Sequence, residues 1–288
     1  MGLDNFIPEI WAPECLRQLE KFLVYAQTGI VNRDYEGVIS GMGDTVHIPG
    51  IGPVTVKKYQ KNTDMDSPET LSDADTKLVI DQGDYFNIFV DSIDKAQQNP
   101  KVMASAMGEA GYSLRDSLDQ FVAGFYTDAS ASNRIGSDAS PKVPNNTSGD
   151  AQNCYNLLVD CSTKLTKSKV PMEGRWIIVP PEYYALLLKD DRFVDASKSG
   201  STDALRNGMV GRAAGFNVLQ SHNVPNTSDT KYEIMFGTDR AISLGVQLVN
   251  LVPYNPEKRF GDAVKGLQVY GGKVVRPDAL GVMTCNFS

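Results

Sequence analysis

Histidine and cysteine, on which most metal centres and many hydrolytic sites depend, are scarce in this chain. Its 288 residues include two histidines and four cysteines. The cysteines form no C-x-x-C pair and have no histidine at metal-ligand spacing beside them, so the sequence predicts neither a zinc centre nor a disulfide scaffold. His47 and His222 are both expected to be structural. We assign no catalytic, metal-binding or cofactor-binding residue, and we expect no cofactor.

Long hydrophobic runs are also missing. The longest, Tyr183–Leu188 and Trp176–Val179, fall far short of the roughly 20 apolar residues that a membrane-spanning helix needs. Residues 1–9 carry neither the basic nor the apolar segment of a secretory signal peptide. We therefore expect no membrane association, and synthesis in the cytoplasm of the cell that makes the protein.

Positive charge is in deficit. The chain has 28 lysines and arginines against 35 aspartates and glutamates, which gives a net charge of −7. A protein whose main task is to hold phosphate backbones carries the opposite balance, so any contact with nucleic acid should be weak or local. The apolar content of 41% instead predicts a folded chain with a substantial core in one or two domains.

The N-terminal third predicts an arm followed by a long hairpin. Apolar residues repeat at helical spacing from Leu16 to Ala26 and Gly29 follows as a stop signal, so residues 8–35 should carry one amphipathic helix. From Asp44 the period changes to two, which is typical of strands. Residues 45–49 and 54–59 should pair with residues 76–80 and 85–90, with the polar residues 60–75 at the tip.

The hairpin carries the candidate functional residues, which we assign to contacts between subunits. Two strands alone are marginally stable in water, so the hairpin should lie either on its own domain or on another subunit. Three lysines at the base of the tip and five carboxylates along it form a basic stem with an acidic end, suited to pairing with a neighbour. A solvated loop tip is the alternative. The residues are Lys57, Lys58, Lys61, Asp64, Asp66, Glu69, Asp73 and Asp75.

Residues 99–127 predict one long helix, which we call the spine helix. Asn99 and Pro100 provide a cap and a first turn, and the apolar residues that follow have a mean spacing of about 3.7, which is α-helical. At 1.5 Å per residue such a helix is roughly 43 Å long, against a radius of gyration of ~19 Å for a compact chain of this size. It should nearly span the molecule. Its predicted core residues are Met103, Met107, Leu114, Leu118, Phe121 and Phe125, together with Ala110.

A second unit should follow a loop or hinge at residues 129–150. Helices at 151–165 and 182–189 flank a buried strand at 175–180, as in an α/β unit. Cys154 and Cys161 are seven residues apart on the first of these helices and should face the core as small hydrophobes. Further short strands are expected around residues 209–210, 216–220, 232–236 and 246–252, and residues 262–287 should form a hairpin or a kinked strand pair.

The order of these elements resembles that of the major capsid proteins of tailed bacteriophages, which have the Hong Kong 97-type capsid fold. Short segments along nearly the whole chain carry the same resemblance. They are Ile7–Trp11, Val31–Glu36, Gly43–Pro49, Ile80–Gln82, Val90–Gln97, Arg175–Pro181, Asn207–Gly211, Gly215–Phe216 and Lys273–Pro277. No segment alone carries a chemically obligatory set of residues, and their order and spacing together make the match specific.

The resemblance implies an α+β chain that builds a shell and catalyses no reaction. It implies an N-terminal arm at residues 1–43, an extended E-loop hairpin at 44–90, the spine helix and hinge of a P-domain at 91–150, an A-domain at 151–250 and returning P-domain strands at 251–288. Hexamers and pentamers would form an icosahedral shell, the capsid of a virion, around double-stranded DNA that it does not bind strongly or specifically. Because no extra N-terminal segment is present as a fused scaffold, a separate scaffolding protein is implied, and with it a portal.

Two other functions stay open at the level of the sequence. One is an encapsulin-like shell of the same fold that encloses a cargo. The other, from a different class, is a soluble α/β hydrolase whose site has no recognisable motif. A shell protein should purify as capsomers or megadalton particles, whereas an enzyme should purify as a small oligomer.

Overall fold

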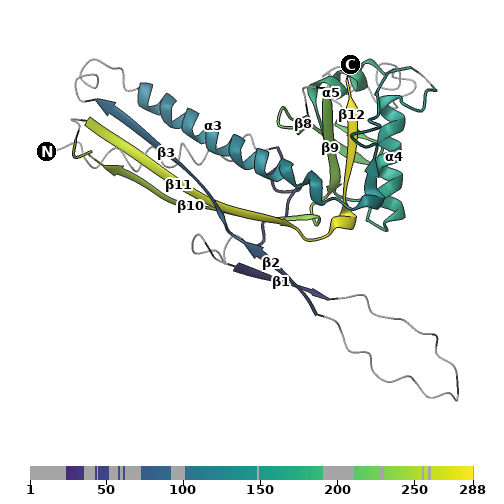
Figure 1. Ribbon diagram of the computed structural model, residues 1–288, viewed down its shortest axis with the longest axis horizontal. Helices are drawn as coiled ribbons and strands as arrows, with labels where there is room; N and C mark the ends of the chain where they lie inside the picture. The colour runs from purple at the N-terminus through teal and green to yellow at the C-terminus, as the bar shows by residue number, and fades with distance from the viewer. Residues whose placement is uncertain are drawn as a thin grey trace.

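The computed structural model describes residues 24–35, 43, 45–51, 58, 61, 73–91, 101–147, 149–190, 211–227, 230–254, 256–258 and 261–287. Within these residues the strands form sheets of two, three and seven strands, accompanied by three α-helices. Figure 1 shows an elongated part built of a sheet and a long helix, a second part around the seven-stranded sheet at one end of it, and a projecting pair of strands.

The elongated part consists of one antiparallel sheet and the spine helix. Its strands lie in the order β10 (Ile242–Tyr254), β11 (Gly261–Val274) and β3 (Gln82–Asp91). Helix α3 (Lys101–Ala123) runs along this sheet and continues as the 3-10 helix η3 (Gly124–Asp128) (Figure 1). The single long helix predicted at residues 99–127 is therefore present, with its last turns wound more tightly.

The seven-stranded sheet forms the second part. Helix α4 (Cys154–Lys167) packs on one of its strands, β12, and on α5 (Pro181–Lys189). Short 3-10 helices, η4 (Ala131–Asn133) and η5 (Pro277–Ala279), precede the strands at one edge. The strand order is β4 (Arg134–Ile135), β12 (Leu280–Asn286), β9 (Lys231–Thr238), β5 (Arg175–Val179), β7 (Phe216–Gln220) and β6 (Arg212–Ala213), with β8 (Asn226–Thr227) also paired to β9.

One hydrophobic core joins the two parts. Leu118 and Val122 near the end of α3 belong to the same buried cluster as the central strand β5 and the inner face of α4. The apolar stripe of α3 explains this shared core. Its earlier residues cover the elongated sheet, and its last residues reach the core of the seven-stranded sheet. Cys154, Cys161 and Cys285 form no disulfide and are buried in this cluster, which confirms the core position predicted for the first two.

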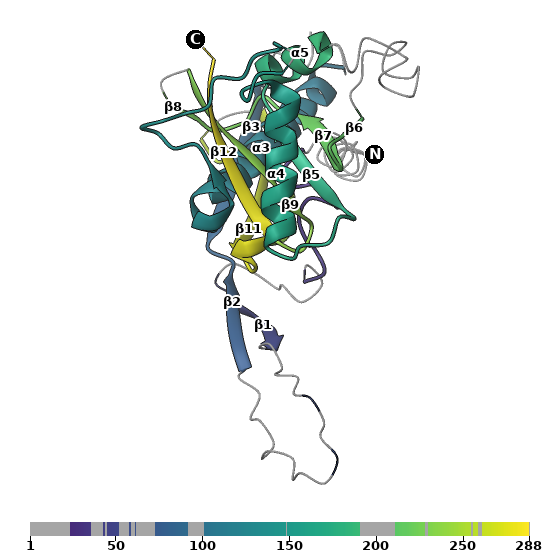
Figure 2. The same cartoon turned by 90° about the vertical axis from the view of Figure 1, so that its right-hand side faces the viewer.

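The third part is the hairpin of β1 (Thr45–Ile51) and β2 (Asp73–Val79). Its strands are antiparallel, with Thr45 opposite Val79 and Ile51 opposite Asp73. It projects away from the two larger sheets, as Figures 1 and 2 both show. The expectation that residues 85–90 belong to this hairpin was wrong. They lie in β3 and pair with β11, because the half-buried side chains of β3 alternate along one face beneath α3.

Two further expectations about secondary structure need correction. Residues 262–274 lie in one continuous strand, β11, which does not fold back on itself. Gly271 and Gly272 form no turn there, and their missing side chains make room for the backbone of Val79 and the ring of Phe125. The helix expected to reach Ala26 is absent from residues 24–35, which form turns and isolated bridges. The expected segment boundary at residue 250 falls inside β10. Residues 1–23 and 209–210 lie outside the described residues.

Candidate functional site

A small separate core fixes the base of the hairpin to its own chain. Five side chains form it: Val46 and Ile48 of β1, Leu78 of β2, Val269 of β11, and Ile80, which follows β2. Each of them is at most 7% exposed. The side chains of Tyr35 and Val275 cover the edge of this cluster. The amide of Gly43 donates to the carbonyl of Ile80 at 2.8 Å, which ties the entry and exit of the hairpin together.

The opposite face of the hairpin is exposed. Thr45 and Val79 are paired across the strands there, and so are His47 and Lys77. Val79 is 44% exposed, although valine is usually buried. Successive residues of a strand point to opposite faces. When one face of the hairpin packs on its own chain, the residues between therefore point away from it. This second face is therefore exposed to solvent at Thr45, His47, Lys77 and Val79.

The structure places the predicted site residues of the hairpin only in part. Lys58 and Lys61 are exposed. Asp73 and Asp75 lie in β2, with their backbones opposite Ile51 and Pro49. The remaining predicted residues, Lys57, Asp64, Asp66 and Glu69, fall outside the described residues, as do the side chains of Asp73 and Asp75. The charge pairing proposed for these groups stays a prediction.

The stripe of the spine helix faces the sheet beneath it. Met107, Leu114 and Leu118 are at most 5% exposed, whereas Phe121 and Phe125 are half-buried. The two phenylalanine rings stack edge to face at 5.1 Å, and Phe121 makes a second such contact with Tyr270 of β11 at 5.1 Å. The side chain of Met103, on the first turn of α3, lies outside the described residues.

A hydrogen-bond network joins three elements just beside the hairpin base. The carboxylate of Asp84 on β3 accepts from the hydroxyl of Ser117 on α3 at 2.5 Å and from that of Tyr270 on β11 at 2.8 Å. Burial raises the pKa of Tyr270, and the Asp84 carboxylate raises it further. The tyrosine therefore stays a neutral donor, and the network holds helix and sheet in one relative position.

Sequence reasoning missed Asp119, which anchors the chain that precedes the hairpin. It is 3% exposed, and its two oxygens accept from the amides of Val24 at 2.9 Å and Ala26 at 3.1 Å. Burial raises the pKa of Asp119, while these amides and Arg115 oppose the rise. An aspartate four residues after an arginine is typical of an exposed helical ion pair, so the spacing gives no signal of this role. The amides that a helix would satisfy internally are satisfied here by Asp119.

A second contact links α3 to the seven-stranded sheet. The amide group of Asn223 donates to Asp116 of α3 at 2.7 Å, and the backbone of Asn223 donates to Ser221 at 3.1 Å. His222, between them, is exposed. The Ser221–Asn223 segment therefore holds two parts of the molecule together, which is a structural task.

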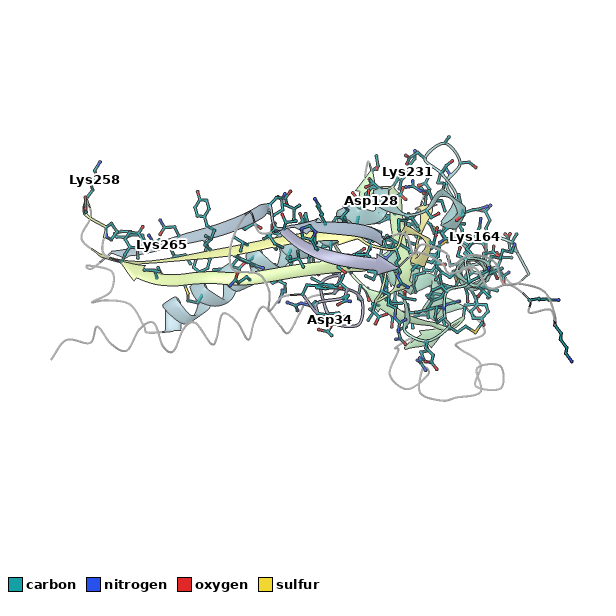
Figure 3. All side chains as sticks on the ribbon, turned by 90° about the horizontal axis from the view of Figure 1, so that it is seen from below. Asp34, Asp128, Lys164, Lys231, Lys258 and Lys265 are labelled. Atoms are coloured by element: carbon teal, nitrogen blue, oxygen red, sulfur yellow. The ribbon has the colours of Figure 1, made fainter. Side chains whose placement is uncertain are left out.

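Positive charge is spread along the molecule. Figure 3 shows Lys258 and Lys265 at the far end of the elongated sheet, and Lys164 and Lys231 at the opposite end. Lys164 and Lys231 donate to the carbonyls of Ser132 and Asp138, so their ammonium groups are used within the chain. This distribution does not make a concentrated phosphate-binding surface among the described residues.

The described part of the chain offers little material for catalysis. No group of three or more potential metal ligands occurs in it, and none of its helices is long and apolar enough to cross a membrane. An open groove of about 640 Å³ runs between β3 and α3, lined by residues 83–88 of the strand and by Glu109, Ala110, Ser113, Leu114 and Ser117 of the helix. This lining holds no histidine or cysteine and presents no arrangement of nucleophile and base.

Comparisons with known proteins identify a family and several solved structures that this chain resembles. A family model described as phage capsid protein matches residues 73–282. The solved structure of Mycobacterium phage Che8 is 28% identical over 98% of both chains, with a TM-score of 0.71. The capsid of the cyanophage P-SCSP1u is 17% identical over 93% of this chain and 90% of that one, with a TM-score of 0.68. A virus-like particle from Pyrococcus furiosus is 16% identical over 96% and 98%, with a TM-score of 0.55. A comparison with curated protein sequences finds no match.

Proposed function

Since this chain belongs to the phage capsid protein family, we propose that it assembles into hexamers and pentamers of an icosahedral shell that encloses double-stranded DNA. The chain is the major capsid protein of a tailed phage, a structural component of the virion capsid and not an enzyme. The observation that carries the proposal is a hairpin with one face anchored on its own sheet and the other face exposed. Such an element has a clear use only when another subunit lies beside it.

The architecture supports the Hong Kong 97-type arrangement. In this proposal residues 1–43 are the arm and 44–81 the E-loop. The helix α3 and the elongated sheet, including β3 and β10, form the P-domain, and the seven-stranded sheet with α4 and α5 forms the A-domain. The long α3 on a narrow sheet fits the P-domain, and the seven-stranded sheet fits the A-domain. A projecting hairpin that contacts a different surface on the next copy gives a head-to-tail interface, which forms a ring when the rotation between copies closes.

The charge distribution supports a container that does not hold its DNA tightly. The net charge is −7, and the described lysines are scattered along the molecule. Weak contact with the wall lets DNA be packed and released, because each neutralised phosphate adds to binding. A separate scaffolding protein, a portal and synthesis in the cytoplasm of a bacterial host complete the proposal.

The runner-up is an encapsulin-like shell that encloses a cargo other than DNA. The likeness to the Pyrococcus furiosus particle supports it, but that likeness is weaker than the likeness to the two phage capsids. Purified particles distinguish the two, because a phage capsid grows together with a scaffolding protein and an encapsulin-like shell forms on its own around a protein.

Electron microscopy of the expressed protein, alone and with its scaffolding protein, tests the function directly. Closed shells of uniform size support it, and a small oligomer under every condition contradicts it. A variant in which a short Gly-Ser linker replaces residues 62–72 leaves β2 intact. It should keep cooperative melting and lose shell formation, because this polar stretch has few apolar residues that a core could bury. Normal shells from this variant would exclude the hairpin tip as an assembly element.

The lysines of the stem give a second test. Exposed ion pairs are each worth only about 0–1 kcal/mol, but a shell repeats them many times. Changing Lys57, Lys58 and Lys61 together to glutamine should raise the protein concentration needed for assembly, and added salt should weaken wild-type assembly more than that of the variant. The matched control changes three other exposed lysines, Lys258, Lys265 and Lys273, and should assemble like the wild type. Equal thresholds for both triple variants would contradict a specific role for the stem.

A further inference from the structure

Where the chain passes from the hairpin into the elongated sheet, its backbone lies against a glycine of β11. Only Ile80 and Asp81 separate β2 from β3, so the chain must turn from one sheet into the other within two residues. It does so against Gly271 of β11, which lies one position beyond the Tyr270–Gln82 pair of the ladder. A Cβ atom at Gly271 would lie 2.8 Å from the Cα of Ile80 and 3.0 Å from the carbonyl carbon of Val79, and it would clash with the carbonyl oxygen of Val79.

These neighbours of Gly271 are all backbone atoms, which have no alternative rotamer. Ordinary contact begins at 3.4 Å, so a side chain at this position would force the backbone of β11 and that of residues 79–80 apart. Gly266 on the same strand is different, because the three atoms nearest to a Cβ there all belong to the ring of Phe86, with the Cζ atom at 2.6 Å. Crowding at Gly266 can be relieved by rotating or shortening the Phe86 side chain. Crowding at Gly271 requires the backbone of the hairpin to tilt.

The surroundings of Gly271 are held rigidly. The hydroxyl of Tyr270, next to it, donates a hydrogen bond to Asp84, which also accepts one from Ser117 of the spine helix. On the hairpin side, Val269 packs into the small core with Leu78 and Ile80. Because hydrogen bonds and packing hold both sides of the crossing, we expect a displacement at Gly271 to change the direction of the hairpin.

We propose that Gly271 is a positioning residue for assembly: by admitting the backbone of Val79 and Ile80 against β11, it sets the direction in which the hairpin reaches a neighbouring copy. This rests on the proposed function, in which the hairpin contacts another subunit. The residue makes no intersubunit contact of its own in this proposal, and it acts through the angle of β1 and β2.

Double electron–electron resonance on the unassembled full-length chain measures that direction. Spin labels go on cysteines introduced at the exposed residues Lys61 and Lys258, in a Cys15→Ser background, while the three buried cysteines stay unlabelled. Gly271→Ala should displace the distance peak by more than its own width. The control Gly266→Ala/Phe86→Leu, crowded only by a side chain that is then shortened, should leave the peak in place. An unmoved peak in Gly271→Ala overturns the proposal.

Assembly of the same variants, without labels, completes the test. Gly271→Ala should give misshapen particles or none at concentrations where the wild type and the Gly266 control give normal shells. A displaced peak with normal shells overturns the proposal, because the direction would then not matter. If the wild type forms no shell at all, the proposed function fails, and the distance measurement still decides whether Gly271 sets the hairpin direction.

Val269→Ala keeps the test decisive if Gly271→Ala is insoluble. Val269 is 1% exposed and belongs to the small core rather than the main one, so its truncation should loosen the crossing while leaving the rest of the chain folded. The distance peak should broaden, with a melting temperature close to that of the wild type. A peak as narrow as that of the wild type overturns the proposal.

Discussion

Replacing Leu118 with alanine tests whether the spine helix and the seven-stranded sheet share one core. Leu118 is 1% exposed and belongs to the main hydrophobic cluster. Leucine and alanine both favour helix, so α3 itself is not weakened. The change removes buried apolar surface and leaves a cavity, at a cost of about 2–5 kcal/mol. At roughly 2–4 °C per kcal/mol for a chain of this size, the unassembled protein should melt about 4–20 °C lower.

The matched control is Gln120→Ala, two residues further along the same helix. Gln120 is exposed and donates only to Asp116 at 2.9 Å, so its loss should change stability by at most about 0.5 kcal/mol. Thermal unfolding is followed by circular dichroism and by tryptophan fluorescence. Trp176 is one of the two tryptophans of the chain and lies in the seven-stranded sheet. If Leu118→Ala melts like the control, or if the two signals separate, the helix and the sheet do not share a core.

Two other changes test the buried carboxylates. Asp119→Ala leaves the amides of Val24 and Ala26 without their acceptor, at about 1–3 kcal/mol for each buried group, so urea should unfold the variant at a lower concentration; an unchanged midpoint would show that water replaces the carboxylate. Burial raises the pKa of Glu233, which accepts from the hydroxyl of Thr284 at 2.9 Å, so the folded chain keeps a proton that the unfolded chain releases. The wild type should therefore lose stability as the pH rises from about 4.3 through the folded-state pKa. Glu233→Gln should lose less over the same range, because Asp119 alone of these two groups then contributes. An equal fall in melting temperature from pH 4 to pH 8 in both proteins would contradict this account.

The elements that the sequence predicted well are those with a strong local period. Helix α3 follows from the apolar stripe that includes Met107 and Leu114, and α4 follows from the stripe that Cys154 and Cys161 share. Strand β5 is fully buried, which agrees with its uninterrupted apolar run. In each case the information lies within one turn or a few residues, so no distant partner is needed to interpret it.

Strand pairing could not be read in the same way. The alternation in residues 82–91 shows an amphipathic strand but does not name its partner, which is β11, far along the chain. Adjacent strands in a sequence usually pair, and that expectation placed residues 85–90 in the hairpin. The glycines at 271 and 272 misled for a related reason. Glycine marks both turns and close approaches, and only the position of Val79 and Phe125 in space distinguishes them.

The candidate site shows the same division between local and distant information. Hairpin polarity and the lysines are visible in the sequence, whereas Asp119 and Gly271 act through groups that the fold brings to them. The small core at the hairpin base has five buried residues and is separate from the main cluster. A two-stranded element held by so few apolar contacts has little stability of its own, so its direction depends on the rigid elements at its base and on whatever covers its exposed face. In the proposed shell, assembly should therefore respond to single atoms at the crossing, far from any contact between subunits.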